Sequence, residues 1–180
     1  AYLCRPKFLS PMTQNWFTCK IKYSKPDNDG IENSVTEMYL VNAFSYTEAE
    51  GRMYQIIQEE LGIGGEVSQI TKSTYMEIFR NDSAEHWFRC KVALVSFDEE
   101  SGKEKHSNQY YLTQADDVKE AFDRISSEMD KSTSDYIIPG ITYTKVLDVY
   151  DWSGDAAEKM RLESQGFKSV GMQPSEDFSE

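Results

Sequence analysis

Long apolar runs are missing from this 180-residue chain, and so are most residues that catalytic and metal sites need. No apolar stretch approaches the length of about 18 residues that a membrane-spanning helix requires. The first residues also lack the apolar segment of a secretory signal. Histidine occurs twice, and the three cysteines, Cys4, Cys19 and Cys90, include no CxxC pair. We therefore expect a protein of a reducing, cytoplasmic compartment with no membrane association.

Positive charge is scarce as well. The chain has 19 Lys and Arg residues against 31 Asp and Glu residues, which gives a net charge of −12. Such a charge opposes sequence-independent binding to phosphate backbones over the whole surface, but it permits a local basic stripe. No GxSxG, P-loop or GxGxxG motif occurs. The sequence therefore predicts no cofactor and no catalytic residue, and a protein that is not an enzyme.

One sequence pattern occurs twice along the chain. NWFTCKIKY begins at residue 15 and HWFRCKVAL at residue 86. MYLVNAFSYTEAE (38–50) aligns with YYLTQADDVKEAF (110–122), and ITKSTYMEIF (70–79) aligns with ITYTKVLDVY (141–150). Matches in one order with single-residue gaps indicate a tandem duplication that covers about residues 12–80 and 81–151.

Each repeat opens with a predicted β-hairpin. Apolar and polar residues alternate over residues 15–23, as expected for a half-buried strand. The turns that follow, KPDNDG (25–30) and DEESGK (98–103), end close to the aligned glycines Gly30 and Gly102. Glycine at this position suits a hairpin turn that needs a positive φ.

A helix is predicted after the second strand of each repeat. Ser45 and Glu48 form a capping-box pattern, and Asp117 and Glu120 occupy the aligned places. Apolar residues recur at helical spacing behind both caps. The first helix is expected to stop at Gly62.

A third strand closes each unit, which gives the order β-β-α-β. A right-handed crossover returns the third strand to lie beside the first, in the order 2-1-3. The predicted fold class is therefore α+β, with two three-stranded sheets, each with one helix, packed with pseudo-two-fold symmetry. The expected segments are an N-terminal extension (1–11), the first ββαβ repeat (12–80), the second (81–151) and an acidic C-terminal tail (152–180) with a short helix in GDAAEKMRLESQGF.

Metal and nucleophile sites find little support. Cys19 and Cys90 fall on the inward face of their strands, and a zinc site needs four close ligands. His86 and His106 align with Asn15 and a serine, so the ligand set is not repeated. We expect buried cysteines that act as small apolar residues, and no metal.

The outward face of the opening strands is the candidate partner-binding site. Trp beside Lys or Arg on an exposed strand can stack bases or anchor an acidic partner. The alternative is that the Trp residues are covered and the basic side chains extend past them to water. The candidate residues are Trp16, Lys20, Lys22, Trp87, Arg89 and Lys91.

The chain resembles an uncharacterised family, a domain of unknown function, found in gut Bacteroidales and in their phages and mobile elements. The resemblance is carried by the segments NWFTCKIKY, VTEMYLVNAFSYTEAEGR, ITKSTYMEIF and HWFRCKV. The resemblance covers about residues 12–151 and begins near Met12, so residues 1–11 are expected to add little to the fold. The resemblance implies that the protein is one of the small accessory proteins of a bacterium or phage and that it is located in the cytoplasm. It implies no activity, substrate or catalytic residue.

Three hypotheses of function follow. The first is a non-enzymatic accessory protein of a phage or mobile element that engages a protein or nucleic-acid partner through the Trp and basic face. The second is an acidic decoy that inhibits a host DNA-binding or defence enzyme through aligned carboxylates. Those carboxylates are Asp27, Asp29, Asp116, Asp117 and Asp123. The third is an enzyme with an unrecognised site, which would need a cleft that holds His86 or His106 beside acids.

Overall fold

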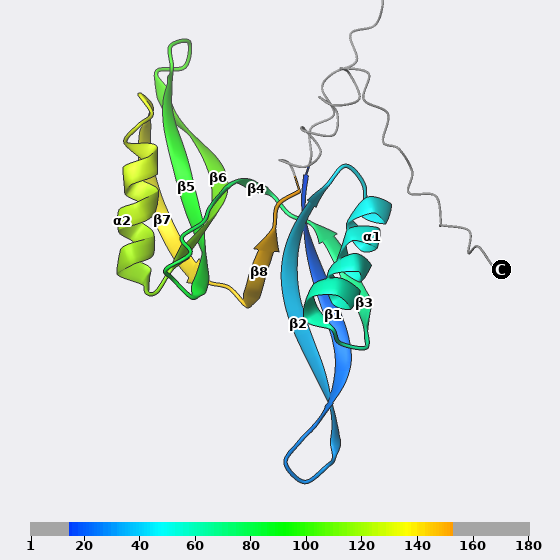
Figure 1. The fold of residues 1–180 in the computed structure, drawn as a ribbon. Helices are drawn as coiled ribbons and strands as arrows, with labels where there is room; N and C mark the ends of the chain where they lie inside the picture. Colours follow the sequence, from blue (N-terminus) through cyan, green and yellow to red (C-terminus); the bar gives the residue numbers. More distant parts are fainter. Residues whose placement is uncertain (1–14, 153–180) are drawn as a thin grey trace, which may run out of the picture. The chain divides into compact units, whose positions relative to one another are not determined.

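A computed structural model describes residues 15–152 (Figure 1). These residues form an α+β fold with two four-stranded sheets and two α-helices. The described part up to Tyr150 belongs to one compact unit. In chain order the elements are β1 (Asn15–Pro26), β2 (Glu32–Ala43), α1 (Tyr46–Ile56), the π-helical turn η1 (Ile57–Leu61), β3 (Gly65–Lys72), β4 (Tyr75–Phe79), β5 (His86–Asp98), β6 (Lys103–Ala115), α2 (Val118–Met129), β7 (Asp135–Tyr143) and β8 (Val146–Tyr150).

The first sheet has the strand order β3-β1-β2-β8. β1 pairs antiparallel with β2 on one side and with β3 on the other. Along β1, Phe17, Cys19 and Ile21 are fully buried on the face that α1 covers, where the Phe17 ring meets the Tyr46 ring of α1. The predicted 2-1-3 order of the first three strands is therefore confirmed.

The second sheet has the order β4-β6-β5-β7, and α2 covers one of its faces (Figure 1). Its helix-side core includes Cys90 and Val92 of β5, packed against Ile125 and Met129 of α2. Spacing by two on the strand and by four on the helix brings these apolar residues together.

The prediction of three-stranded sheets is wrong, because each sheet gains a fourth strand from the other half of the chain. Within the aligned segment at 70–79, the chain breaks between Lys72 and Tyr75 into two strands, β3 and β4, and β4 then pairs in parallel with β6 of the second sheet. In the same way, β8 pairs in parallel with β2 of the first sheet. A sheet covered by a helix on one face leaves the other face open, and the exchanged strands help to bury it.

The exchanged strands join one apolar cluster with residues of both sheets. Leu40 from β2 and Leu112 from β6 are fully buried there, together with Trp87, Val146 and Val149. This cluster lies on the helix-free faces, meaning the sheet faces opposite α1 and α2. The partly buried residues packed against the cluster are Trp16, Met38, Tyr75 and Ile78.

Both helix caps agree with the sequence prediction. The Ser45 hydroxyl accepts the N–H of Glu48 at 3.2 Å, and the Asp117 carboxylate accepts the N–H of Glu120 at 2.8 Å. Each glutamate in turn accepts the N–H of the residue before the cap, at 2.8 Å. The helical segment that starts at α1 ends at Gly62, whose φ of 60° is the left-handed conformation expected there.

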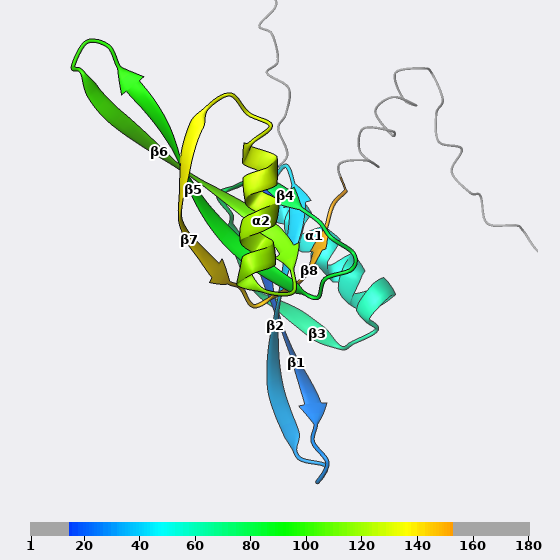
Figure 2. The same ribbon diagram turned by 90° about the vertical axis from the view of Figure 1, so that its left-hand side faces the viewer.

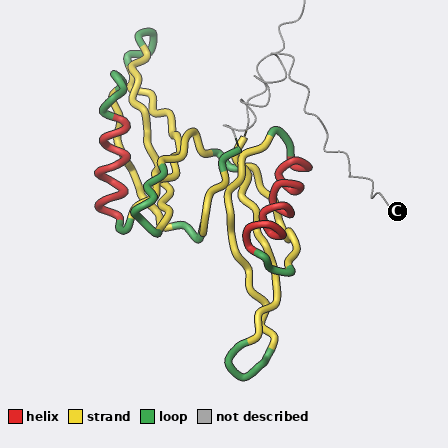
Figure 3. Tube along the Cα trace, viewed as in Figure 1, coloured by secondary structure: helices red, strands yellow, loops and turns green. Residues whose placement is uncertain are grey.

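The two hairpins are long, and each extends beyond the helix that covers its sheet (Figure 2). Their turns are the loops at the hairpin ends in Figure 3. Gly30 and Gly102 take φ values of 78° and 64°, as the turn prediction requires. Asp27 fixes the first turn by accepting the N–H groups of Asp29 and Ile31. The predicted extension (1–11) and, apart from Trp152, the acidic tail and its short helix lie outside the described residues.

Candidate functional site

The two tryptophans of the repeated motif are not a surface platform. Trp87 is 1% exposed within the shared apolar cluster, and Trp16 is partly buried against that cluster. The expectation of an exposed Trp face is therefore wrong for Trp87. Strand alternation predicts that a residue lies on the helix-free face, but it does not predict that this face is covered locally.

The tryptophan backbone also holds the segments that cross between the sheets. Ser73, between β3 and β4, donates its N–H to the carbonyl of Trp16 at 2.8 Å. Thr144, at the aligned place between β7 and β8, donates its N–H to the carbonyl of Trp87 at 2.9 Å. Its hydroxyl donates to the same carbonyl at 2.8 Å. The repeated Trp therefore marks the points where strands leave one sheet for the other.

Lys20 and Lys22 form a basic patch on β1, which we name the β1 patch. Both lie on the helix-free face of an interior strand, and Lys22 is exposed. Lys20 lies opposite Met38 and Gln69 in the neighbouring strands. Glu66 lies opposite Lys22 in register, but the two side chains form no ion pair. Both ammonium groups are therefore available to an external anion.

Arg89 and Lys91 form a second basic patch on β5, the β5 patch. The Arg89 guanidinium carbon lies 4.1 Å from the centroid of the Tyr110 ring of β6, which is a close cation–π contact. Tyr75 of the edge strand β4 is the register partner of Tyr110, so both rings lie on this face. Burial raises the pKa of Tyr75, and the nearby Arg89 partly opposes this rise. Among residues 15–152, neither member of the β5 patch forms an ion pair.

The candidate residues thus divide between two sheets. The structure brings Lys20 and Lys22 together on one sheet and Arg89 and Lys91 on the other, while both Trp residues belong to the apolar cluster. The sequence analysis missed Tyr110. Its signal was the Tyr-Tyr pair at 110–111, because successive strand residues point to opposite faces and one of the two had to share the face of Arg89.

Both helical segments carry more acids than bases. Residues 46–61, which cover α1 and η1, carry four acids and one base, and α2 carries three acids and two bases. By contrast, β1 carries three lysines and no acid. The basic patches therefore lie on strands at the helix-free faces, whereas both helical segments carry a net negative charge.

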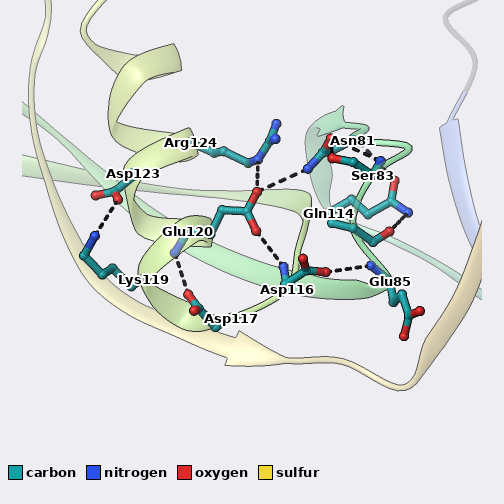
Figure 4. A network of polar contacts seen from close by, with 11 residues as sticks. Asn81, Ser83, Glu85, Gln114, Asp116, Asp117, Lys119, Glu120, Asp123 and Arg124 are labelled. Carbon is teal, nitrogen blue, oxygen red and sulfur yellow. Dashed lines mark hydrogen bonds and ion pairs between the residues drawn. The ribbon is translucent and has the colours of Figure 1, made fainter.

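A polar network surrounds the start of α2 (Figure 4). The Glu120 carboxylate accepts hydrogen bonds from the backbone N–H of Asp116, from Asn81 and from Arg124. The backbone bond from Asp116, followed by the bond and the charge of Arg124, holds the pKa of Glu120 below its ordinary value of 4.5. Asp117 caps the helix and Asp116 accepts the N–H of Glu85. The network stabilises a helix start.

Four of the five carboxylates of the decoy hypothesis are engaged in hydrogen bonds or an ion pair. Asp27 accepts three hydrogen bonds within its own turn, and these keep its pKa below its ordinary value. Asp123 pairs with Lys119 at 3.4 Å along α2. Asp27 and Asp29 belong to the turn of the first hairpin, whereas Asp116, Asp117 and Asp123 surround the start of α2.

Cys19 and Cys90 are buried core residues, as the sequence predicts. Both are 0% exposed and neither forms a disulfide. Burial raises the pKa of each thiol to about 12. Since the thiolate is the nucleophile, these thiols are poorly reactive in the native fold.

The two histidines lie in different surroundings. The His86 ring makes an edge contact with the Tyr143 ring, with centroids 5.5 Å apart, and His106 lies 3.7 Å from Glu104. Two open grooves of about 420 and 310 Å³ occur in the first half, and neither is lined by a histidine. Within residues 15–152, no group of three His, Cys, Asp or Glu residues is placed to hold a metal ion.

The helices of the described segment are all too short or too polar to cross a membrane.

The fold and its surface define a class of α+β protein with two helix-covered sheets that share strands, and with basic patches on its two interior opening strands. The chain belongs to the family described as Domain of unknown function (DUF4494), whose model matches residues 15–152. No curated protein matches the chain. The resemblance to an uncharacterised family is thereby confirmed.

Proposed function

We propose that this chain is a non-enzymatic accessory protein of a phage or mobile element that binds an anionic partner through the β1 and β5 patches. One observation carries the proposal: four cationic side chains that form no ion pair within residues 15–152 lie on interior strands of a chain with a net charge of −12. An external anion can bind these cations without breaking an ion pair of the described residues. On the same faces, the buried Trp87 and the partly buried Trp16 pack in or against the apolar cluster and support this scaffold.

The setting is part of the same proposal. The shared sequence motifs support a phage or mobile-element origin and a cytoplasmic location in the host. We also infer that the two halves arose by tandem duplication and retain pseudo-two-fold symmetry. The aligned motifs, the matching helix caps and the matching backbone bonds at Trp16 and Trp87 support this inference.

Partner capture by the full chain tests the proposal. Wild-type protein, Lys20→Ala/Lys22→Ala and Arg89→Ala/Lys91→Ala would be used as baits in host lysate, with mass spectrometry of bound protein and sequencing of bound nucleic acid. Lys119→Ala is the matched control, because it removes an exposed cation from α2. We expect the captured component to be lost from the patch variants and kept by the control.

The patch substitutions remove exposed or half-exposed side chains, so the thermal melting temperatures of the variants should stay close to that of the wild type. An identical captured set for all four baits would show that the patches do not bind the partner. If one patch variant had both a lower melting temperature and no captured partner, unfolding could explain its loss of binding. The other patch variant would then decide, since the two patches lie on different sheets.

A further inference from the structure

The β5 patch is more than a pair of charges. The Arg89 guanidinium lies over the Tyr110 ring at 4.1 Å, and its other face is not occupied by a carboxylate in the described part of the chain. A planar guanidinium that is already stacked on one ring is pre-organised to stack on a second flat group. Lys91 follows two residues later on the same face, about 7 Å along the strand.

Two neighbouring groups on this face are hydrogen-bond donors. Thr142 of β7 lies opposite Arg89, and Asn108 of β6 lies opposite Ala93, further along the hairpin. Ammonium, hydroxyl and amide groups are those that contact phosphate and sugar oxygens in nucleic-acid complexes. The face therefore combines a stacking platform with donors for a phosphate backbone.

The first half lacks this combination. Thr18 and Met38 occupy the places that Arg89 and Tyr110 occupy in the second half, as the aligned strand registers show. The β1 patch can therefore attract anions but has no stacked guanidinium. Any base-dependent binding is confined to the second half.

We propose that the β5 patch is a stacking site for single-stranded nucleic acid, in which a base lies on Arg89 and an adjacent phosphate contacts Lys91. This proposal rests on the proposed function, because it names the anionic partner. A single strand exposes base faces and covers a narrow path over a sheet. A duplex hides its base faces and presents a broader phosphate surface to an acidic protein.

Fluorescence anisotropy of the full chain with a short labelled oligothymidylate tests the proposal. The comparison probes are an abasic oligomer of the same length, a blunt duplex and labelled polyglutamate. Arg89→Lys keeps the charge and removes the planar stacking surface. Its affinity for oligothymidylate should fall by about five-fold or more, the usual effect of losing one stacked base. Its affinity for the abasic oligomer should match that of the wild type.

Lys91→Ala should lower the affinity for all oligonucleotides alike. It should also reduce the slope of log affinity against log salt concentration by about one. Lys119→Ala, on α2, should change neither quantity. Equal affinity of the wild type for oligothymidylate and the abasic oligomer, or tighter binding of the duplex, would overturn the stacking site. Binding of polyglutamate alone, lost in the patch variants, would overturn the nucleic-acid proposal and leave the proposed function standing. Binding of none of these polyanions would overturn both.

Discussion

Trp87 should contribute about twice as much to the folding free energy as Trp16, although both occupy the same place in the repeated motif. A buried Trp side chain removes about 200 Å² from water, which corresponds to roughly 5 kcal/mol. Trp87 is 1% exposed in the cluster that both sheets share, so we expect Trp87→Ala to cost about 3–5 kcal/mol. Trp16 is only partly buried, and Trp16→Ala should cost about half as much.

A second variant separates packing from hydrogen bonding. The Trp87 indole N–H is buried without a partner in the described residues, which costs about 1–3 kcal/mol. Trp87→Phe removes this donor while it keeps most of the ring, so its net change should lie within about 1 kcal/mol of zero. At this position the packing of the Trp87 ring stabilises the fold, whereas the unpaired indole N–H destabilises it.

Urea unfolding followed by circular dichroism measures these differences, with the m value as a check that the unfolded states are comparable. A Trp87→Ala loss below about 1 kcal/mol would refute the burial of this side chain, as would a larger loss at Trp16. The surface variants Lys20→Ala and Lys22→Ala should unfold at the same urea concentration as the wild type.

Three further outcomes are expected. Asp117→Ala should lower stability by about 0.5–2 kcal/mol through loss of the α2 cap, whereas Asp117→Asn should be nearly neutral, as thermal unfolding will measure. The folded pKa of Glu120 lies below 4.5, so its contribution to stability is present above that pH and is lost as the pH falls through the lower folded pKa. Glu120→Gln should therefore make the melting temperature depend less on pH on the acid side. In a Cys4→Ser background, Cys19 and Cys90 should resist a thiol reagent at pH 8 and react fully after unfolding; fast native reaction would contradict their burial.

Local features of the fold were predictable because their causes are local. Ser45 and Asp117 cap helices through bonds that span three residues, and Gly30 and Gly102 permit the turn conformation within a few residues. The 2-1-3 order followed from the handedness of a single crossover. Each of these predictions needed only the residues of one repeat.

The strand exchange was not predictable in the same way. β4 and β8 pair in parallel with strands of the other half, and no short-range pattern determines such a pairing. The polar pairs Ser73-Thr74 and Thr144-Lys145 interrupt the apolar pattern where the strands break, and they were the only local sign. The prediction of the candidate site failed at Trp87 for the same reason, because the exchanged strands cover Trp87, while Arg89 stays exposed and Lys91 half-exposed.

Reciprocal completion of the sheets also constrains how such a gene can change. A recombination breakpoint between residues 80 and 85 would separate each sheet from a strand encoded on the other side of the breakpoint. Neither half could then be transferred to another gene as an independent module, because it would leave with an open sheet edge and an exposed apolar face. We therefore expect the two halves to be inherited as a pair, and a change in one cluster residue such as Leu40 to alter the packing of strands encoded in both.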